Sequence, residues 1–355
     1  MKKLFTGIVL MLLVVGGYFY LALTVPSIGN QTRELFKYIS FQKDRIEDAK
    51  DIIETAAKTP DVPKNENVTQ IVKEDNKIAE TLGRDESTAV TVSYIDVGQG
   101  DAILIESAGQ YMLIDTGNWD ATKKLFSVLE EYGVTELSAL VLTHNDADHI
   151  GNADDLIYQY PVKRLYMTYE QKDTNSYKNL VSAIKGKEGG ANLEVSFPFI
   201  GDKIPLGNVV LDVLGPVKGK KYDDSNSYSI ILKLVNGNDS FLFTGDATGE
   251  EVEDAASVGA DFGAEVLKLA HHGSANCGCN SEIFLNTVDA TTFVVSCGLK
   301  NDFGHPHVET MNYARTKGIH LFRTDLQGTI VGKSYGNGIV WNKPYTDIYT
   351  NGNNL

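Results

Sequence analysis

Short apolar runs that end in polar residues fill the chain between about residue 90 and residue 345. Their alternation and their Gly, Asp or Asn boundaries predict short strands. The expected strands are residues 91–97, 102–106, 111–114, 140–142, 209–214, 229–235, 240–244, 265–269, 291–296 and 319–323, with a closing hairpin at 328–331 and 338–341. Apolar positions at helical spacing predict helices over residues 119–132, 248–256 and 308–317. Strands interleaved with helices over about 255 residues predict one α/β domain spanning residues 90–345.

The first 26 residues have a different pattern. Met1-Lys2-Lys3 precedes an uncharged apolar run that ends near Val25. A run of roughly 20 residues can cross a bilayer as a helix, and the two lysines predict a cytoplasmic N-terminus with the rest of the chain outside. We therefore expect a membrane anchor at residues 1–26. The alternative is a cleaved signal peptide and a secreted protein, but no clear A-x-A cleavage site follows the run.

Residues 27–89 and 346–355 do not carry the pattern of the main domain. The first segment has charged, amphipathic helical stretches interrupted by Pro60 and Pro63, and it has too little apolar surface for a core of its own. Such a composition predicts a polar helical stalk or linker. The Asn- and Gly-rich last ten residues predict a disordered tail.

The densest chemistry follows the apolar run at residues 140–142. His144, Asp146, Asp148 and His149 fall within six residues, on a loop between a strand and a helix. Imidazoles and carboxylates this close together can bind one or two divalent metals. A polar turn with surface charges is the alternative, although a turn of that kind rarely concentrates these side chains so tightly.

Further metal-binding side chains follow other predicted strands. Asp115, Asp246 and the pair His271-His272 each come just after a short apolar run, so all of them are expected at one edge of a sheet sandwich. Six of the seven histidines fall in three motifs, the third being Gly304-His305-Pro306-His307. His320 is the exception, and its apolar strand predicts a core or edge histidine.

Charge and cysteine content narrow the picture. The net charge of −15 is not that of a general polyanion binder, although it allows a small, locally positive cleft to which Lys268, Lys300 and Arg323 could contribute. The three cysteines, Cys277, Cys279 and Cys297, leave a disulfide, a Cys-x-Cys metal site and free thiols all open.

The order of these motifs resembles the metallo-β-lactamase superfamily and, more narrowly, the hydrolase domain of ComEC-type DNA-uptake competence proteins. The matching motifs lie between residues 90 and 335. They are Ile95-Asp96-Val97-Gly98-Gln99-Gly100-Asp101, Asp115-Thr116-Gly117, the segment 143–151, Thr244-Gly245-Asp246, His271-His272-Gly273-Ser274, Gly304-His305-Pro306-His307 and Arg323-Thr324-Asp325. The resemblance implies a four-layer αββα sandwich. The sequence around Ile150-Gly151-Asn152 is also similar, more weakly, to that of secreted phosphorylcholine esterases.

The resemblance also implies the roles of the site residues. It implies two divalent metals that share Asp246 as a bridge, one with His144 and Asp146, the other with Asp148, His149 and either His271 or His272. Asp148, Asn226, Ser274 and His305, with His307, are the candidates for catalysis or for contacts with the ligands and the substrate oxygens. Asp115 is expected to orient a ligand histidine. Turn formation alone is the alternative role for Asp115 and Ser274.

Two departures from the superfamily pattern bear on the metal. Asp146 stands where a histidine is common, and no histidine lies between His149 and His271, so residues 223–227 are expected to occupy the position of a later ligand. More oxygen ligands shift the preference toward manganese, with zinc as the alternative.

Three functions follow as expectations. The first is a membrane-anchored extracellular phosphodiesterase or nuclease that acts on nucleic acid or nucleotides. The second is a hydrolase of cell-wall phosphoesters similar to the phosphorylcholine esterases. The third is a binding domain with a degraded metal site, which the full ligand set disfavours. The many-helix channel of competence proteins has no counterpart in this sequence, so the resemblance does not imply DNA transport.

Overall fold

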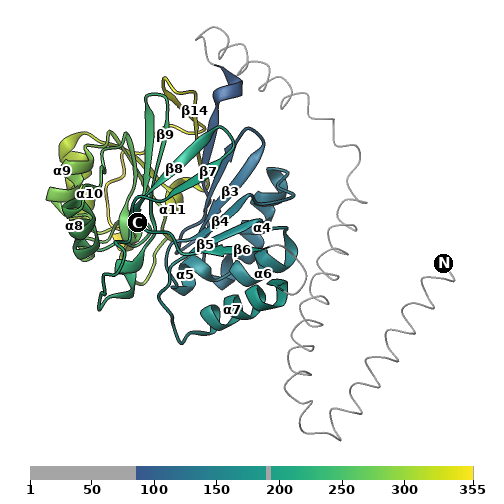
Figure 1. Cartoon of the computed structure of the whole chain (residues 1–355). Coiled ribbons are helices and arrows are strands. Elements are labelled where there is room, and N and C mark those ends of the chain that lie inside the picture. The colour runs from purple at the N-terminus through teal and green to yellow at the C-terminus, as the bar shows by residue number, and fades with distance from the viewer. Residues whose placement is uncertain (1–84, 189–192, 355) are drawn as a thin grey trace, which may run out of the picture. The chain divides into compact units, whose positions relative to one another are not determined.

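The computed structural model describes residues 85–188 and 193–354, which form two β-sheets with helices on their outer faces (Figure 1). The described chain begins with η2 (Glu86–Thr88). No helix within these ranges is long and apolar enough to cross a membrane. The predicted anchor at 1–26 and nearly all of the predicted stalk at 27–89 lie outside the described residues, so both stay predictions.

The first sheet has eight strands in the order β15-β14-β1-β2-β3-β4-β5-β6. Their bounds are β1 Val90–Tyr94, β2 Ile103–Ser107, β3 Gln110–Ile114, β4 Ala139–Leu142, β5 Arg164–Met167, β6 Glu194–Ser196, β14 Ile330–Ser334 and β15 Ile339–Trp341. Strands β3 to β6 run parallel, whereas the pairs from β15 to β3 are antiparallel. The carboxyl ends of β3 and β4 therefore lie at the same edge.

The second sheet has seven strands in the order β13-β12-β11-β10-β9-β8-β7. Their bounds are β7 Lys203–Leu206, β8 Val209–Gly215, β9 Ile231–Asn236, β10 Asp239–Phe243, β11 Val266–Lys268, β12 Thr292–Val295 and β13 His320–Arg323. Strands β10 to β13 run parallel and β7 to β10 antiparallel. His320 lies exposed on the edge strand β13 and stacks on Tyr345, so the prediction of an edge histidine is confirmed.

Three apolar layers hold the sandwich together. The inner faces of the two sheets share one core, which includes Tyr94, Val141, Phe241 and Phe243. The outer face of the first sheet packs on α4 (Thr122–Glu131), α6 (Ala153–Gln159) and α7 (Asn175–Glu188). The outer face of the second sheet packs on α8 (Gly249–Ser257), α9 (Glu282–Val288) and α10 (Val308–Lys317). The expected four-layer αββα arrangement is present.

Several elements between α6 and β8 are absent from the sequence predictions. Strands β5, β6 and β7 are only three or four residues long, and β6 and β7 lie at the sheet edges with little buried surface. Helix α7 is polar, and few of its residues are buried. Short, half-exposed elements carry a weak periodic signal, because tertiary packing rather than the local pattern selects their conformation.

The end of the described chain makes contacts with the second sheet. Residues 346–354, expected to be a disordered tail, lie against the second sheet and end in η6 (Gly352–Asn354). The backbone N–H of Thr346 donates to the carbonyl of Leu321 at 2.7 Å. The buried guanidinium of Arg323 donates to the carbonyls of Ile348 and Thr350 at 3.3 and 2.5 Å. The main partner of this polar segment is thus a buried arginine elsewhere in the sequence.

Candidate metal centre

The carboxylate of Asp246 lies among the imidazoles of four histidines. It follows β10, and its oxygens lie 3.2 Å from Nε2 of His149, 3.7 Å from Nε2 of His271 and of His272, and 3.9 Å from Nε2 of His144. The rings of His144 and His149 are 4.1 Å apart between centroids. These five side chains come from three strand ends in two sheets. The predicted ligands His144, His149, Asp246, His271 and His272 are thus brought together.

Asp115 holds the ring of His149 in place. It follows β3 with a φ of 59°, and its buried carboxylate accepts hydrogen bonds from the backbone N–H and the hydroxyl of Thr143 at 2.8 and 2.7 Å. Oδ2 of Asp115 also lies 2.8 Å from Nδ1 of His149. Because Nδ1 is engaged, Nε2 of His149 turns toward Asp246. A carboxylate behind a ligand histidine fixes the tautomer and orientation of that ring, and this contact is the one predicted for Asp115.

The two adjacent histidines have an unusual backbone. His271 and His272, in η5 (Ala270–Gly273), have φ values of 46° and 55°, in the left-handed region that non-glycine residues rarely adopt. Nδ1 of the buried His272 donates to the carbonyl of Ser296 at 2.9 Å, which leaves Nε2 3.1 Å from Oδ2 of Asp148. Nδ1 of His271 lies 3.4 Å from the amide nitrogen of Asn226. Both rings therefore present Nε2 to the carboxylates.

Asp146 and Asp148 lie at the more open side of this cluster. Oδ2 of Asp146 is 3.9 Å from Nε2 of His144, and its other oxygen pairs with Lys172. Asp148, in α5 (Ala147–Ile150), contacts His272. The backbone at residue 100 passes so close to Asp148 that only glycine fits there. A Cβ on Gly100, whose φ is +133°, would lie 2.3 Å from the carbonyl oxygen of Asp148.

The buried polar atoms fit a metal. Nε2 of His144, Nε2 of His149 and Oδ1 of Asp246 are buried without a hydrogen-bond partner. Leaving such atoms unsatisfied costs about 1–3 kcal/mol each. Ligand atoms of His144, His149 and Asp246 lie within 4.8 Å of one another, and so do those of Asp148, His149 and His272. Imidazoles with carboxylates suit a divalent ion such as zinc or manganese. His149 belongs to both groups, which places it nearer to His144 than the resemblance implies.

The protonation equilibria of these side chains reflect the same crowding. Burial lowers the pKa of His149, but Asp246 and Asp115 outweigh it and raise that pKa well above its usual value. Burial and the neighbouring His149 hold the pKa of His144 well below its usual value. Against the effect of burial, Asp246, Asp101 and Asp148 raise the pKa of His272 to about 9. The cluster thus retains protons where a metal would supply positive charge.

One ion pair at the centre was not among the predicted site residues. Asp101, which follows Gly100, pairs with the fully buried Lys268, and its Oδ1 lies 3.4 Å from Nδ1 of His272. Asp101 thus supports His272 from behind, as Asp115 supports His149. The motif 95–101 pointed to it, but the ion pair joins residues that are 167 positions apart. Since Lys268 and the Asp325-paired Arg323 are both buried, neither offers a free charge to a substrate.

The remaining catalytic candidates surround the centre unequally. Asn226, in η4 (Ser225–Tyr228), lies beside His271 as described above. The ring centroid of His305 is 5.4 Å from that of His271 and 5.9 Å from that of His272, and burial together with both histidines lowers its pKa to about 3. The hydroxyl of Ser274 accepts from the backbone N–H of Asn276 at 3.2 Å, a local turn contact. His307 accepts from the backbone N–H of Ala275 at 3.0 Å. Catalytic roles for Asn226, Ser274 and His305 stay predictions.

The cysteines take no part in a disulfide. Cys277, Cys279 and Cys297 are all free thiols, and the last two are buried in the core of the second sheet and its helices. Burial raises the pKa of the Cys277 thiol to about 11. The structure therefore has no disulfide among them, and no cysteine belongs to any of the candidate metal-binding groups found in the described residues.

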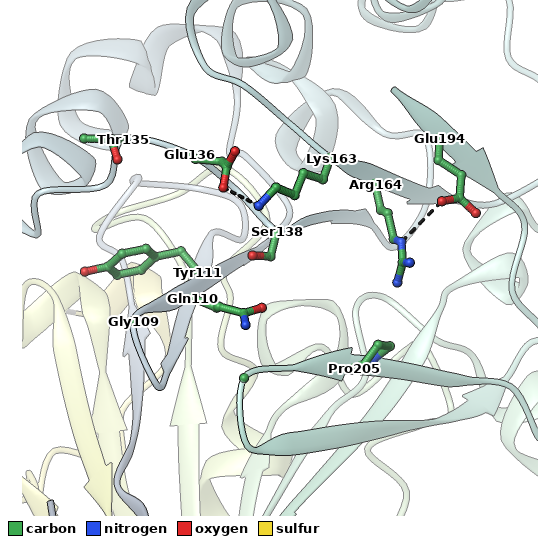
Figure 2. Close-up of a pocket in the computed structure, with 11 residues that line it drawn as sticks. Gly109, Gln110, Tyr111, Thr135, Glu136, Ser138, Lys163, Arg164, Glu194 and Pro205 are labelled. Atoms are coloured by element: carbon green, nitrogen blue, oxygen red, sulfur yellow. Dashed lines mark hydrogen bonds and ion pairs between the residues drawn. The ribbon is translucent and has the colours of Figure 1, made fainter. Parts of the chain in front are cut away.

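A pocket of about 650 Å³ lies at the opposite end of the first sheet (Figure 2). Its walls come from the amino ends of β3, β4, β5 and β6 and from the β7–β8 turn, whereas His144 and Asp115 follow the carboxyl ends of β4 and β3. Its charged residues form two ion pairs, Lys163 with Glu136 and Arg164 with Glu194. We therefore locate the candidate active site at the buried histidines and not in this pocket, despite the volume of the pocket.

The comparisons with known proteins agree with this site. A family model described as the metallo-beta-lactamase superfamily matches residues 95–276 of the 355-residue chain. The chain therefore belongs to the metallo-beta-lactamase superfamily, and this membership indicates a metal-dependent hydrolase.

Its curated relatives are competence proteins of the ComEC type, as the motifs predicted. It is 32% identical over 257 residues to ComE operon protein 3 of Bacillus subtilis, covering 67% of this chain and 32% of the relative. It is 31% identical over 244 residues to competence protein ComA of Neisseria gonorrhoeae, covering 68% of this chain and 32% of the relative. The chain thus spans about a third of the length of these relatives. Among solved structures, the metallo-beta-lactamase fold protein YhfI of Bacillus subtilis matches with a TM-score of 0.47 and 12% identity, covering 69% of this chain and 99% of YhfI.

Proposed function

We propose that the domain is a metal-dependent phosphodiesterase that acts on nucleic acid or nucleotides. The observation that carries the proposal is the position of Asp246 among four histidines, where two imidazole nitrogens and one carboxylate oxygen are buried without a hydrogen-bond partner. The resemblance to DNA-uptake competence proteins, with which the relative named competence protein ComA agrees, favours nucleic acid as the substrate class. A bound divalent ion would polarise a phosphoryl oxygen and bring the pKa of water close to neutrality.

The residues of the chain would divide the remaining work. Asp115 and Asp101 orient His149 and His272, so that their Nε2 atoms face the centre. Asp148, partly exposed and within 3.1 Å of His272, lies at the open side of the site, where its carboxylate could help to hold the ion. Fixed side chains of this kind need no rearrangement at the moment of reaction, which is the general source of electrostatic catalysis.

The experiment that tests this function is hydrolysis of bis-(p-nitrophenyl) phosphate and of single-stranded DNA by the metal-loaded domain. Activity is expected in the wild type and a loss of at least about 100-fold in Asp148→Ala. The exposed Asp120→Ala is the matched control and should keep wild-type activity. A loaded wild type that leaves every phosphodiester intact but opens a lactam or a thioester would show that the reaction class is different.

A second candidate is hydrolysis of cell-wall phosphoesters such as phosphocholine esters. The net charge of −15 favours it over long DNA, because neutralising many phosphates needs clustered lysine and arginine. Cleavage of a phosphocholine ester with single-stranded DNA left intact would select it.

Metal preference is part of the proposal. Asp146 supplies oxygen where a histidine is common in the superfamily, which favours manganese over zinc. Asp146→His should therefore shift the ratio of zinc to manganese affinity upward, measured by competition with a chelator. An unchanged ratio would remove this argument for manganese.

Membrane attachment is proposed from the sequence alone, with the catalytic domain outside the cell. Protease added to intact cells should then release the folded domain. Full-length protein found only in the cytosol would contradict the proposal.

A further inference from the structure

Lys172 makes a contact with the candidate metal centre that no sequence motif indicates. It lies between β5 and α7, and its ammonium pairs with Oδ1 of Asp146. The other oxygen of the same carboxylate, Oδ2, is the one that lies 3.9 Å from Nε2 of His144. One carboxylate can therefore face His144 with one oxygen and hold Lys172 with the other. The lysine does not have to leave for Asp146 to serve as a ligand.

The segment that carries Lys172 is tied to the centre on both sides. The side-chain amide of Asn145, next to His144, donates to the backbone carbonyl of Glu170 at 2.5 Å. The hydroxyl of Tyr169 donates to the carbonyl of Lys220 at 2.9 Å, and its ring packs edge-on against Tyr228 with centroids 5.4 Å apart. Tyr228 belongs to η4, which also carries Asn226. The backbone just before Lys172 is thus held by the segment around His144 and by the segment 220–228, and these contacts fix where Lys172 lies.

The charges at this end of the sheets make Lys172 distinctive. Asp146, Asp148 and Asp246 all face the centre, and their negative charge opposes the approach of a phosphate. Lys268 and Arg323 have fully buried side chains and pair with Asp101 and Asp325. Lys172, by contrast, pairs with Asp146 beside the centre, and its side chain is 18% exposed. A substrate reaching the centre can therefore contact this cation.

We propose that Lys172 is a substrate-binding residue, whose ammonium donates to a non-bridging phosphoryl oxygen of a phosphodiester while Asp146 holds it beside the centre. The assignment rests on the proposed phosphodiesterase function and deepens it. A lysine ammonium acts as a compact positive charge with three donors, which suits a phosphate that is also held from another direction. The ammonium can keep Asp146 as one acceptor and offer its other N–H groups to the substrate.

A different arrangement would have Lys172 replace one of the two metals. The ammonium would then neutralise Asp146 permanently, and the centre would hold a single ion. The two arrangements predict opposite results for metal content when the lysine is removed, so they can be separated.

The test uses the metal-loaded full chain with Lys172→Met, Lys172→Arg and, as a control, Lys178→Met. Lys178 is 60% exposed, lies six residues further along and pairs with Asp173 away from the centre. Inorganic phosphate is the binding probe, measured by calorimetry, and metal content is measured by elemental analysis. For Lys172→Met we expect phosphate affinity to fall about 10-fold, the scale of one charge-assisted hydrogen bond, with metal content unchanged. Lys172→Arg should recover most of the affinity, and Lys178→Met should match the wild type.

Steady-state kinetics give an independent readout. With bis-(p-nitrophenyl) phosphate, Lys172→Met should raise KM by about 10-fold and change kcat less, since a contact made with both substrate and transition state is lost. Phosphate affinity of the wild type should also fall more steeply with salt than that of Lys172→Met. A merely structural role of Lys172 would not move the salt dependence in this way.

The failures of the two proposals can be told apart. An inert wild type that still binds phosphate through Lys172 would overturn the phosphodiesterase function, and Lys172 would remain a phosphate-binding residue of a site with another substrate. An active wild type with unchanged phosphate affinity and KM in Lys172→Met would overturn the assignment alone. So would additional bound metal in Lys172→Met, which would show that the ammonium occupies a metal position. Absence of any phosphate binding by the loaded wild type would also overturn it.

Discussion

Charged side chains gather at both ends of the first sheet, but they do so in different surroundings. At the carboxyl ends of the parallel strands, the side chain of His144 is fully buried and that of Asp246 is 4% exposed. At the amino ends, the side chains of Lys163 and Glu194 are 59% and 65% exposed, and each belongs to a solvated ion pair (Figure 2). The charged groups in the pocket of Figure 2 are therefore exposed and paired, whereas the centre includes buried nitrogen and oxygen atoms that have no hydrogen-bond partner.

This difference separates a functional cluster from an ordinary polar surface. An exposed ion pair contributes about 0–1 kcal/mol and needs no explanation. Buried, unsatisfied nitrogen and oxygen atoms are costly, and they persist where a bound ion repays the cost. Burial, not the number of charged residues, identifies the site, and each of the following measurements tests that conclusion.

The largest effect is expected for Asp246→Asn. The amide can no longer supply the negative charge that faces four histidines, so metal affinity should fall by more than about 100-fold, beyond the loss typical of a supporting residue. Elemental analysis and chelator competition would measure it. Glu194→Gln at the opposite end is the control and should bind metal like the wild type. Normal metal content in Asp246→Asn would contradict the assignment of the centre.

Removal of the carboxylate behind His149 should have the next largest effect. In Asp115→Asn the side chain cannot accept from Thr143 N–H, Thr143 O–H and His149 all at once, so the ring of His149 loses its fixed orientation. Metal affinity is expected to fall by about 10- to 100-fold. The exposed Asp120→Asn, five residues along, should leave it unchanged. Equal metal affinities in the two variants would mean that Asp115 only stabilises the local turn.

Glu251 is a buried carboxylate that belongs neither to the candidate metal centre nor to the pocket of Figure 2. Glu251 in α8 is fully buried, neither oxygen has a hydrogen-bond partner, and burial raises its pKa well above the usual value. Because the folded state keeps this proton longer, its contribution to stability is complete below the unfolded pKa and is lost as the pH rises through the folded pKa. Each unit of pKa difference corresponds to about 1.4 kcal/mol.

Chemical unfolding of Glu251→Gln across that pH range measures this effect. The variant should lose the decline in the free energy of unfolding that the wild type shows with rising pH, while the exposed Glu253→Gln should retain it. Parallel pH profiles for the wild type and Glu251→Gln would show that the carboxyl is not held protonated by the fold.

The smallest effect is expected at the pocket of Figure 2. Lys163→Met breaks the exposed pair with Glu136 and should change the free energy of unfolding by no more than about 0.5 kcal/mol. Metal content should remain that of the wild type. A large loss of stability or of metal would mean that this end of the sheet is coupled to the centre.

The strands that frame the site were predictable because their signal is local. The runs ending at Ile114, Leu142 and Phe243 alternate or are wholly apolar, and a polar residue of the site follows each within a few residues. The short strands β5, β6 and β7 were not predictable, since runs of three or four residues give no clear periodic signal. Nor were the contacts of residues 346–354 with Arg323, because this buried arginine lies elsewhere in the sequence. The predicted membrane anchor and stalk lie almost wholly outside the described residues and keep the standing of predictions.

The sequence by itself determined which side chains are available and that most of them follow strand ends, because residue type and strand period are properties of consecutive positions. Only the tertiary structure decided which atoms meet. The central position of Asp246 and the pairing of Asp101 with Lys268 join segments that are brought together by the packing of two sheets. The contact of Lys172 with Asp146 joins the segments that follow two adjacent parallel strands, β4 and β5. Such contacts depend on strand order and on the register between distant segments, and the local hydrophobic pattern carries no information about either.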